Sequence, residues 1–224
     1  MIRVVVFDAY GTLLDVDAAA RRAAESPGSG RLGEVWSALA RDWRAKQLEY
    51  SWLRAVAGQH TDFWTVTGDS LDWAMEAHGL TGVDLRNRLM DLYRRLEVFP
   101  EVTEVLAHLR DRGLATAILS DGSPGMLADA VEAAGLGRHL DRVLSVEEAG
   151  VYKPHPKVYA LVEQAFGCAP AEVLFVSSNG WDAAGAAAFG FRTLWVNRRG
   201  LPVDRLFARP AHIAADLTGL KELI

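Results

Sequence analysis

Residues 4–12 read Val-Val-Val-Phe-Asp-Ala-Tyr-Gly-Thr, four apolar residues followed by an acid and then by a turn. A continuous run of β-branched and aromatic residues predicts a strand that is buried on both faces, as the central strands of parallel sheets are. Asp8 then ends that strand, where a buried carboxylate is costly unless it is paired or used in chemistry. The segment therefore predicts an α/β fold with a paired or reactive acid after its first strand.

The second half of the chain alternates short apolar runs with helical patterns. Strands are predicted over residues 114–119, 142–145, 173–176 and 193–196, and helices from Pro100 to Gly113, from Ser123 to Gly135, over 157–166 and over 181–189. Strands that alternate with helices in this way pair in parallel and are covered by the helices on both faces. The fold class expected is an α/β parallel sheet flanked by helices.

Residues 16–97 interrupt this alternation. They have a helical pattern throughout, show no convincing strand and contain five of the seven tryptophans, at positions 36, 43, 52, 64 and 73. We therefore predict a core domain of residues 1–15 and 98–224 with an inserted helical cap of residues 16–97. Because open α/β sheets bind ligands beyond the carboxyl ends of their strands, an insertion directly after the first strand is expected to cover the site.

Composition limits the classes of protein that fit. The 224 residues include 29 acidic and 24 basic ones, a net charge of −5 without a basic run, so neither a nucleic acid nor a membrane is expected as a partner. The lone Cys168 cannot form an internal disulfide, and the apolar stretch after Met1 is too short for a signal peptide. We expect a cytoplasmic protein.

Polar side chains follow four of the predicted strands. They are Asp8 and Thr12 after the first, Ser120 and Asp121 after the second, Lys153 after the third, and Ser177, Ser178, Asn179 and Asp182 after the fourth. Taken singly, such a Ser, Asn or Asp is commonly a helix N-cap, and Lys153 could be a surface lysine before a turn. Together, at one edge of a parallel sheet, they indicate a functional site.

These segments resemble the haloacid dehalogenase-like hydrolase superfamily over essentially the whole chain. The matching motifs are residues 7–13, 119–122, 152–154 and 175–182, in that order and spacing. Most members look like phosphatases, with a second acid two residues after the first and a metal-binding acid after the fourth strand. Tyr10 and Ser178 stand at those positions here, and neither supplies the acid that leaving-group protonation and Mg²⁺ binding need. Neither phosphatase chemistry nor a metal is expected.

The chain resembles the metal-free branch of that superfamily, the L-2-haloacid dehalogenases, in residues 8–12, in the cap segment 43–54 and in residues 177–182. Arg44 has an independent signal, because it lies four residues from both Ala40 and Leu48 and shares their apolar helix face. A guanidinium placed there favours anion binding over snorkelling to the margin. The resemblance implies no cofactor, a small 2-substituted carboxylic acid as the partner and, as in many members, a homodimer.

The resemblance also implies a two-step hydrolysis. Asp8 attacks C2 of an L-2-haloacid, displaces the halide and forms an aspartyl ester, and water then attacks the ester carbonyl to release a 2-hydroxy acid. Thr12, Ser177 and Asn179 would hold Asp8 and position the water, Lys153 would neutralise charge beside Asp8, and Asp182 would orient Lys153 and help to activate the water. Ser120 would bind the substrate carboxylate. The family's substrate-pocket positions are matched by Tyr10, Leu48, Phe63 and Trp181, and a position that supports the pocket is matched by Tyr159.

Two residues depart from the family's pattern: Asp121 stands where Asn is usual, and Ala45 where Gln is usual. An amide donates a hydrogen bond to a leaving halide, whereas an ionised carboxylate only accepts and repels. Arg44 would then hold the halide alone or pair with Asp121. Asp121 could instead bind the ring ammonium of L-azetidine-2-carboxylate, the substrate of other members of the family. That activity is the leading alternative, and a phosphatase and a non-catalytic binding protein remain further ones.

Overall fold

The computed structural model describes residues 1–224, and its centre is a six-stranded parallel sheet. The strand order is β3-β2-β1-β4-β5-β6, and every neighbouring pair is parallel. The strands are β1 (Val4–Phe7), β2 (Ala115–Ser120), β3 (Arg142–Ser145), β4 (Val173–Ser177), β5 (Arg192–Val196) and β6 (His212–Ala214). The predicted α/β class is confirmed, with β1 between β2 and β4 and fully buried.

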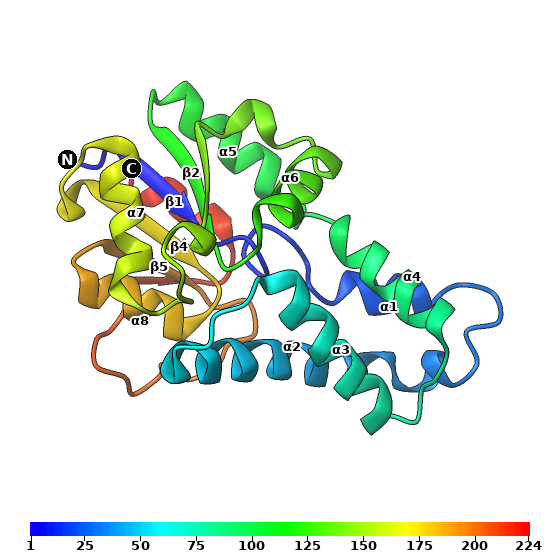
Figure 1. Cartoon of the computed structure of the whole chain (residues 1–224). Coiled ribbons are helices and arrows are strands. Elements are labelled where there is room, and N and C mark those ends of the chain that lie inside the picture. The colour runs from blue at the N-terminus through cyan, green and yellow to red at the C-terminus, as the bar shows by residue number, and fades with distance from the viewer.

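Helices cover both faces of this sheet (Figure 1). They are α5 (Val102–Asp111), α6 (Pro124–Ala133), α7 (Pro156–Phe166) and α8 (Gly180–Phe189), with short 3₁₀ helices at Gly137–His139, Val146–Glu148, Pro170–Glu172 and Leu217–Glu222. In Figure 1, α5 and α6 lie on one side of the strands and α7 and α8 on the other. The direction of strand succession reverses at β1, and such a reversal point is where open α/β sheets bind ligands.

Four helices lie between β1 and α5 in the sequence. They are α1 (Ala18–Ala24), α2 (Arg31–Ala57), α3 (Phe63–Ala77) and α4 (Val83–Arg94), and we call them the helical insertion. In Figure 1, α1 and α4 extend away from the sheet, and α2 runs from the far end of this group back beneath α8. The long α2 ends at Gly58, whose positive φ of 65° lets it cap the helix in the left-handed conformation. Asp62 then starts α3 by accepting a hydrogen bond from the Thr65 amide.

The two segments that connect the insertion to the sheet pair with each other. The amide of Asp15 donates to the carbonyl of Glu97 at 2.8 Å, and the amide of Phe99 donates to the carbonyl of Leu13 at 3.1 Å. Leu14 and Val98 form an antiparallel bridge between these bonds. We call residues 13–15 and 97–99 the linker ribbon, and the predicted domain boundary falls on it.

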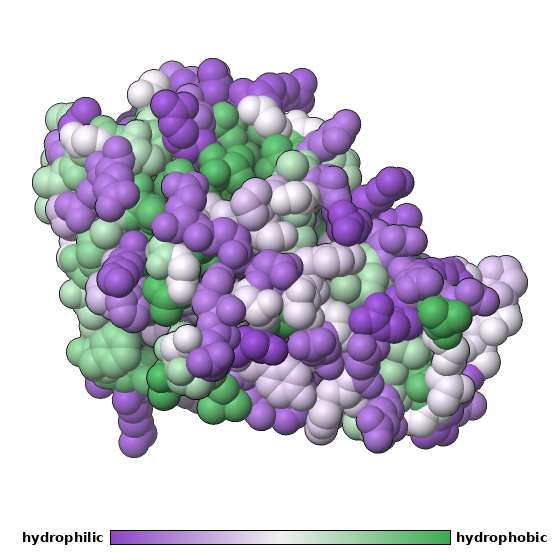
Figure 2. Space-filling model, viewed as in Figure 1, coloured by the Kyte–Doolittle hydropathy of each residue, from purple (hydrophilic) through white to green (hydrophobic).

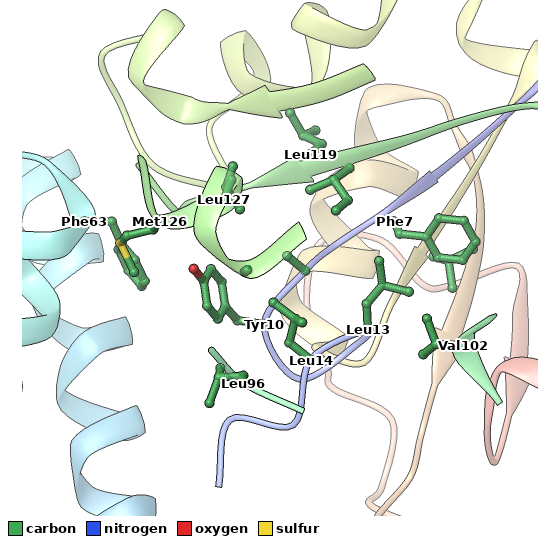
Figure 3. Packing of buried hydrophobic residues seen from close by; sticks show 14 of the residues in the cluster. Phe7, Tyr10, Leu13, Leu14, Phe63, Leu96, Val102, Leu119, Met126 and Leu127 are labelled. Carbon is green, nitrogen blue, oxygen red and sulfur yellow. The ribbon is translucent and has the colours of Figure 1, made fainter. Parts of the chain in front are cut away.

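The apolar core continues from the sheet into the insertion. In Figure 3, Tyr10 lies between the side chains of Leu13 and Leu14 and that of Phe63, which comes from α3. The ring centroids of Tyr10 and Phe63 are 6.1 Å apart. On the face that Figure 2 shows, hydrophilic residues predominate over the insertion, with apolar residues scattered among them. Not one of the helices combines the length and the apolar character that crossing a membrane requires.

Candidate active site

Asp8 follows β1 and is the centre of a buried hydrogen-bond network. Its amide donates to the carbonyl of Val176 at 2.9 Å, which extends the β1–β4 ladder and fixes the direction of the side chain. Oδ2 accepts from the Thr12 hydroxyl at 3.0 Å and from the Asn179 amide group at 2.9 Å. Oδ1 accepts from Nζ of Lys153 at 3.2 Å. The carboxylate is therefore held at three points, and Oδ1 keeps a lone pair free of protein donors.

The turn after Asp8 aims the Thr12 hydroxyl back at it. The amide of Leu13 donates to the carbonyl of Ala9, and Gly11 adopts a φ of 90° that a residue with a side chain would rarely take. The amide of Ser178 donates to Thr12 Oγ1 at 2.8 Å, so the hydroxyl is fixed from the β4 side as well. Ser178 belongs to the polar residues expected after the fourth strand, but this contact with Thr12 was not predicted.

Lys153 lies between two buried carboxylates. Its Nζ donates to Asp182 Oδ2 at 2.9 Å and to Asp8 Oδ1 at 3.2 Å, and its side chain is 1% exposed. Burial by itself lowers the pKa of a lysine, but the charges of Asp182 and Asp8 outweigh it, so the pKa of Lys153 lies above its ordinary value. The ammonium therefore stays charged and neutralises one of the two carboxylates.

Asp182 lies in the first turn of α8 and is fully buried. Its Oδ1 accepts from the Tyr159 hydroxyl at 2.8 Å, while Oδ2 accepts from Lys153. Burial raises the pKa of Asp182, and Lys153 opposes that shift. A Cβ placed on Gly185 would collide with the Tyr159 oxygen, so the absence of a side chain at this glycine leaves the space that Tyr159 occupies. In the sequence, only the Ala/Gly-rich composition of this helix indicates that small residues are required there.

Ser177 and Ser120 shape turns beside Asp8 and form no hydrogen bond with it. Ser177 Oγ accepts from the Asn179 amide at 3.1 Å, which places Asn179 so that its side chain reaches Asp8. Ser120, at the end of β2, accepts from the Gly122 amide at 3.1 Å. The hydroxyl of Ser120 is buried within the turn after β2, one residue before Asp121.

Asp121 adds a third carboxylate to the same region. Its Oδ1 accepts from the backbone amide of Lys153 at 3.1 Å, and the residue is 8% exposed. Burial raises the pKa of Asp121 to about 7, although the nearby Lys153 ammonium opposes the shift. Arg44 forms no ion pair with Asp121; its Nη2 instead donates to the carbonyl of Tyr10 at 3.3 Å.

The expected pocket residues come from the insertion, from α8 and from the turn after β1. The Tyr10 ring stacks on Tyr93 at a centroid distance of 5.5 Å, and its buried hydroxyl has no hydrogen-bond partner. Leu48, one helical turn beyond Arg44, is half-buried. Trp181 is half-buried too. Its ring is nearly perpendicular to that of Trp52, on α2, and the two ring centroids are 5.3 Å apart. The insertion thus brings apolar rings and one guanidinium to the carboxyl edge of the sheet.

The side chains around Asp8 do not have the arrangement of a metal site. No group of three or more His, Cys, Asp or Glu side chains is arranged to hold a metal ion. The Lys153 ammonium occupies the position between the Asp8 and Asp182 carboxylates. The cation that these two carboxylates share is therefore a side chain of the protein.

Known proteins are similar to this chain in sequence and architecture. Residues 2–190 match the family model of the haloacid dehalogenase-like hydrolases. The chain is 44% identical to (S)-2-haloacid dehalogenase 1 of Pseudomonas sp. (strain CBS-3), over 100% of this chain and 96% of that protein. A dehalogenase crystal structure superimposes with a TM-score of 0.94 at 42% identity, covering 100% of this chain and 97% of that one.

A further solved structure is that of the L-2-haloacid dehalogenase from Xanthobacter autotrophicus with chloropropionic acid covalently bound. It is 38% identical, has a TM-score of 0.87, and the match covers 100% of this chain and 98% of that one. The likeness extends over the sheet and the insertion alike, since it spans the whole chain. The chain belongs to the (S)-2-haloacid dehalogenase family of the haloacid dehalogenase-like hydrolases.

Proposed function

We propose that this protein hydrolyses short L-2-haloalkanoic acids to 2-hydroxy acids through an ester on Asp8, without a metal ion. The observation that carries the proposal is the asymmetric environment of the Asp8 carboxylate. Oδ2 accepts two hydrogen bonds from neutral donors, whereas Oδ1 accepts only from Lys153. The names of the relatives and the covalently bound chloropropionic acid in the Xanthobacter autotrophicus enzyme support this choice of substrate.

In the first step, Oδ1 of Asp8 attacks C2 of the acid from the side opposite the halide. A C–O bond forms as the C–halogen bond breaks, and the halide leaves with the bonding electron pair. Arg44 is the half-buried cation on the insertion side, with one backbone hydrogen bond and no carboxylate partner, so it is the group available to a departing anion. The rings of Tyr10, Phe63 and Trp181 exclude water from the reacting carbon.

In the second step, water attacks Cγ of the Asp8 ester, and the negative charge develops on Oδ2. Thr12 and Asn179 already donate to that atom, so they stabilise the charge without moving. Asp182 takes the proton from the water. It is the carboxylate linked to Asp8 through Lys153, and it remains an unesterified carboxylate when Asp8 carries the ester. When the intermediate collapses, the bond between Cγ and the ester oxygen breaks, and the departing alkoxide takes up the proton from Asp182. Asp8 is restored, and the 2-hydroxy acid is released.

Isotope labelling during a single turnover tests this proposal. Excess protein is mixed with L-2-chloropropionate in H₂¹⁸O and EDTA, halide release is measured, and the peptide containing Asp8 is analysed by mass spectrometry. The proposal expects halide release and one ¹⁸O atom in Asp8, with unlabelled product. Label that appears directly in the first product would show attack by water on C2, and inhibition by EDTA would show a need for metal. Asp8→Ala is the inactive control.

A second substrate class is favoured by one observation, the carboxylate of Asp121 beside Lys153. When ionised, Asp121 can accept a hydrogen bond from an ammonium leaving group, as in the ring opening of L-azetidine-2-carboxylate. Asp8 would attack the ring carbon, the C–N bond would break, and the amine would remain on the product. Running this acid beside L- and D-2-chloropropionate, chloroacetate and fluoroacetate compares the two classes directly.

A further inference from the structure

Arg198 follows β5 and contacts two segments that are far from it in the sequence. Its Nη2 donates to the carbonyl of Thr12 at 3.0 Å, and its Nη1 forms an ion pair with Glu101 Oε1 at 2.7 Å. Its Cζ lies 3.7 Å from the centroid of the Phe99 ring. One guanidinium therefore contacts the turn after Asp8 and the segment by which the chain returns from the insertion.

Both contacts lie at the base of the linker ribbon. Thr12 immediately precedes the ribbon residues 13–15, and Phe99 is the last residue of the partner segment, with Glu101 two residues beyond it. Thr12 is completely buried, and Arg198 is the only group that donates to its carbonyl. Without that donor the carbonyl would be a buried acceptor lacking a partner, which the turn could relieve only by moving.

The chemistry of the contact requires an arginine. The planar guanidinium can donate from separate nitrogens to the Thr12 carbonyl and to Glu101 while its face packs on the Phe99 ring. A lysine has a single nitrogen on a flexible stem and cannot make the stacking contact in the same geometry. The side chains of Arg198 and Glu101 are 19% and 15% exposed, so solvent screens this pair less than it screens pairs on the open surface.

We propose that Arg198 is a positioning residue for Asp8. It holds the Thr12 carbonyl against Phe99 and Glu101, and this keeps the Thr12 hydroxyl within hydrogen-bond distance of Asp8 Oδ2. Arg198 touches neither Asp8 nor the pocket rings, so its effect reaches the reaction only through Thr12. The inference rests on the proposed function, in which Thr12 stabilises the charge on Oδ2.

The kinetic consequence is a fall in kcat with little change in KM. Phe63, Trp181 and Arg44 lie on helices that Arg198 does not contact, so substrate binding changes little. The donor to Oδ2 is displaced, and a misplacement of about 1 Å at a reacting group can lower the rate by about 10²-fold. For Arg198→Met we expect kcat to fall by about 10- to 100-fold, and for Arg198→Lys by less.

The test compares Arg198→Met, Arg198→Lys and Arg198→Ala with a matched control, Arg192→Met. Arg192 is exposed at the opposite end of β5 and makes no side-chain hydrogen bond or ion pair, so this variant should keep wild-type kinetics. Ethylguanidinium added to Arg198→Ala should restore part of kcat, because the guanidinium site is partly open to solvent. An unchanged kcat in Arg198→Met, or a loss confined to KM, overturns the inference.

Amide hydrogen exchange provides a readout that does not depend on turnover. Exchange of peptides from residues 9–15 and 97–101 should be faster in Arg198→Met than in the wild type, and unchanged in Arg192→Met. If the wild-type protein releases no halide from any haloacid, the proposed function fails, yet faster exchange at these peptides would still support the positioning role. Unchanged exchange at residues 9–15 would overturn that role whatever the substrate is.

Discussion

The backbone amide of Lys153 donates to Oδ1 of Asp121 at 3.1 Å, so the chain that places the ammonium beside Asp8 also holds a third carboxylate. Asp8, Asp121 and Asp182 then surround a single ammonium, and full ionisation of all three would leave two uncompensated charges in a buried region. The raised pKa of Asp121, about 7, is the result of that burial. The charge at the site therefore depends on pH within the physiological range.

The first prediction concerns the pH profile of dehalogenation. Below its pKa of about 7, Asp121 is neutral and can donate a hydrogen bond to a departing halide; above it, the carboxylate only accepts and repels an anion. We expect kcat/KM for L-2-chloropropionate to fall as pH rises through about 7. Initial rates between pH 5 and 9 measure this pH dependence. If the fall in kcat/KM above pH 7 were unchanged in Asp121→Asn, a group other than Asp121 would cause it.

The second prediction concerns substrate choice in Asp121→Asn. An amide always donates, so one pH unit above the pKa of Asp121 this variant should dehalogenate about tenfold faster than the wild type, in which only about a tenth of the molecules carry the proton. Turnover of L-azetidine-2-carboxylate, if present, should fall. Assays of both acids at pH 8 give the ratio, and an equal ratio in the two proteins would contradict a role for Asp121 in selecting the leaving group.

The third prediction concerns stability. The pKa of Asp121 is about 7 in the folded chain and near its ordinary value of 3.8 when unfolded, so between these pH values the folded state holds a proton that the unfolded state has lost. This contribution to the free energy of unfolding therefore decreases as pH rises from about 4 to about 7. Asp121→Asn should stabilise the protein by on the order of 2 kcal/mol at pH 8 and by less at pH 5. Urea unfolding of the wild type and the variant at pH 5 and pH 8 measures the stabilisation. An equal stabilisation at the two pH values would contradict a raised pKa of Asp121 in the folded state.

The fourth prediction concerns Tyr159→Phe. Loss of the hydroxyl removes a donor to Asp182 Oδ1, and a hydrogen bond to a charged group contributes about 1.5–3 kcal/mol. We expect kcat to fall about tenfold, and the acidic limb of the pH profile to move to higher pH because this bond lowers the pKa of Asp182. Tyr50→Phe, on a half-buried tyrosine whose hydroxyl makes no hydrogen bond, is the control. If the acidic limb stayed at the same pH in Tyr159→Phe, the hydrogen bond from Tyr159 would have no effect on the pKa of Asp182.

The fifth prediction concerns Gly185→Ala. The new methyl group would collide with the Tyr159 oxygen and lie 2.7 Å from Cβ of Pro154, so the helix or Tyr159 must shift. We expect a loss of about 1–3 kcal/mol in the free energy of unfolding and a lower kcat, since Tyr159 would leave Asp182.

Gly125→Ala, in α6, is the matched control for that substitution. Its Cβ would meet nothing within 4 Å, so the change should leave kcat unaltered and stabilise the helix by up to about 1 kcal/mol. Chemical denaturation and steady-state rates compare the two variants. If Gly185→Ala and Gly125→Ala had equal free energies of unfolding, the space at Gly185 would not be needed to accommodate Tyr159.

The sequence predicted most of the sheet well because β1 and β4 are short, apolar and fully buried, and β2, β3 and β5 each contain a buried apolar run. β3 was placed at its observed residues, and β2, β4 and β5 within one residue. The three-residue β6 was missed, since His-Ile-Ala is partly exposed and gives no apolar run. The helical pattern of residues 16–97 was recognised, whereas its division into α1–α4 depends on turns at Gly58 and Gly82 that the pattern alone did not resolve.

The candidate site was predictable to the extent that it lies at strand ends. Asp8, Lys153 and Asp182 were expected together because parallel strands bring their carboxyl ends to one edge, and the structure joins them by hydrogen bonds. The contacts of Ser178 and Arg198 with Thr12 were not predicted: Ser178 lies in a matching motif that assigns it no contact, and Arg198 lies outside the motifs, 186 positions from Thr12. The turn contact that Ser177 makes with Asn179 also needed coordinates.

The linker ribbon has a consequence for how a substrate reaches Asp8. The chain leaves the sheet and returns to it at adjacent, paired residues, so the insertion is tied to the core along one narrow hinge. A rotation of α1–α4 about that hinge would stretch no covalent connection, but it would break side-chain contacts between the insertion and the core, among them those of His60 with Glu147 and of Arg94 with Asp129. Opening of the site by such a rotation would have a single axis, and the residues at the base of that axis include Thr12, which donates to Asp8.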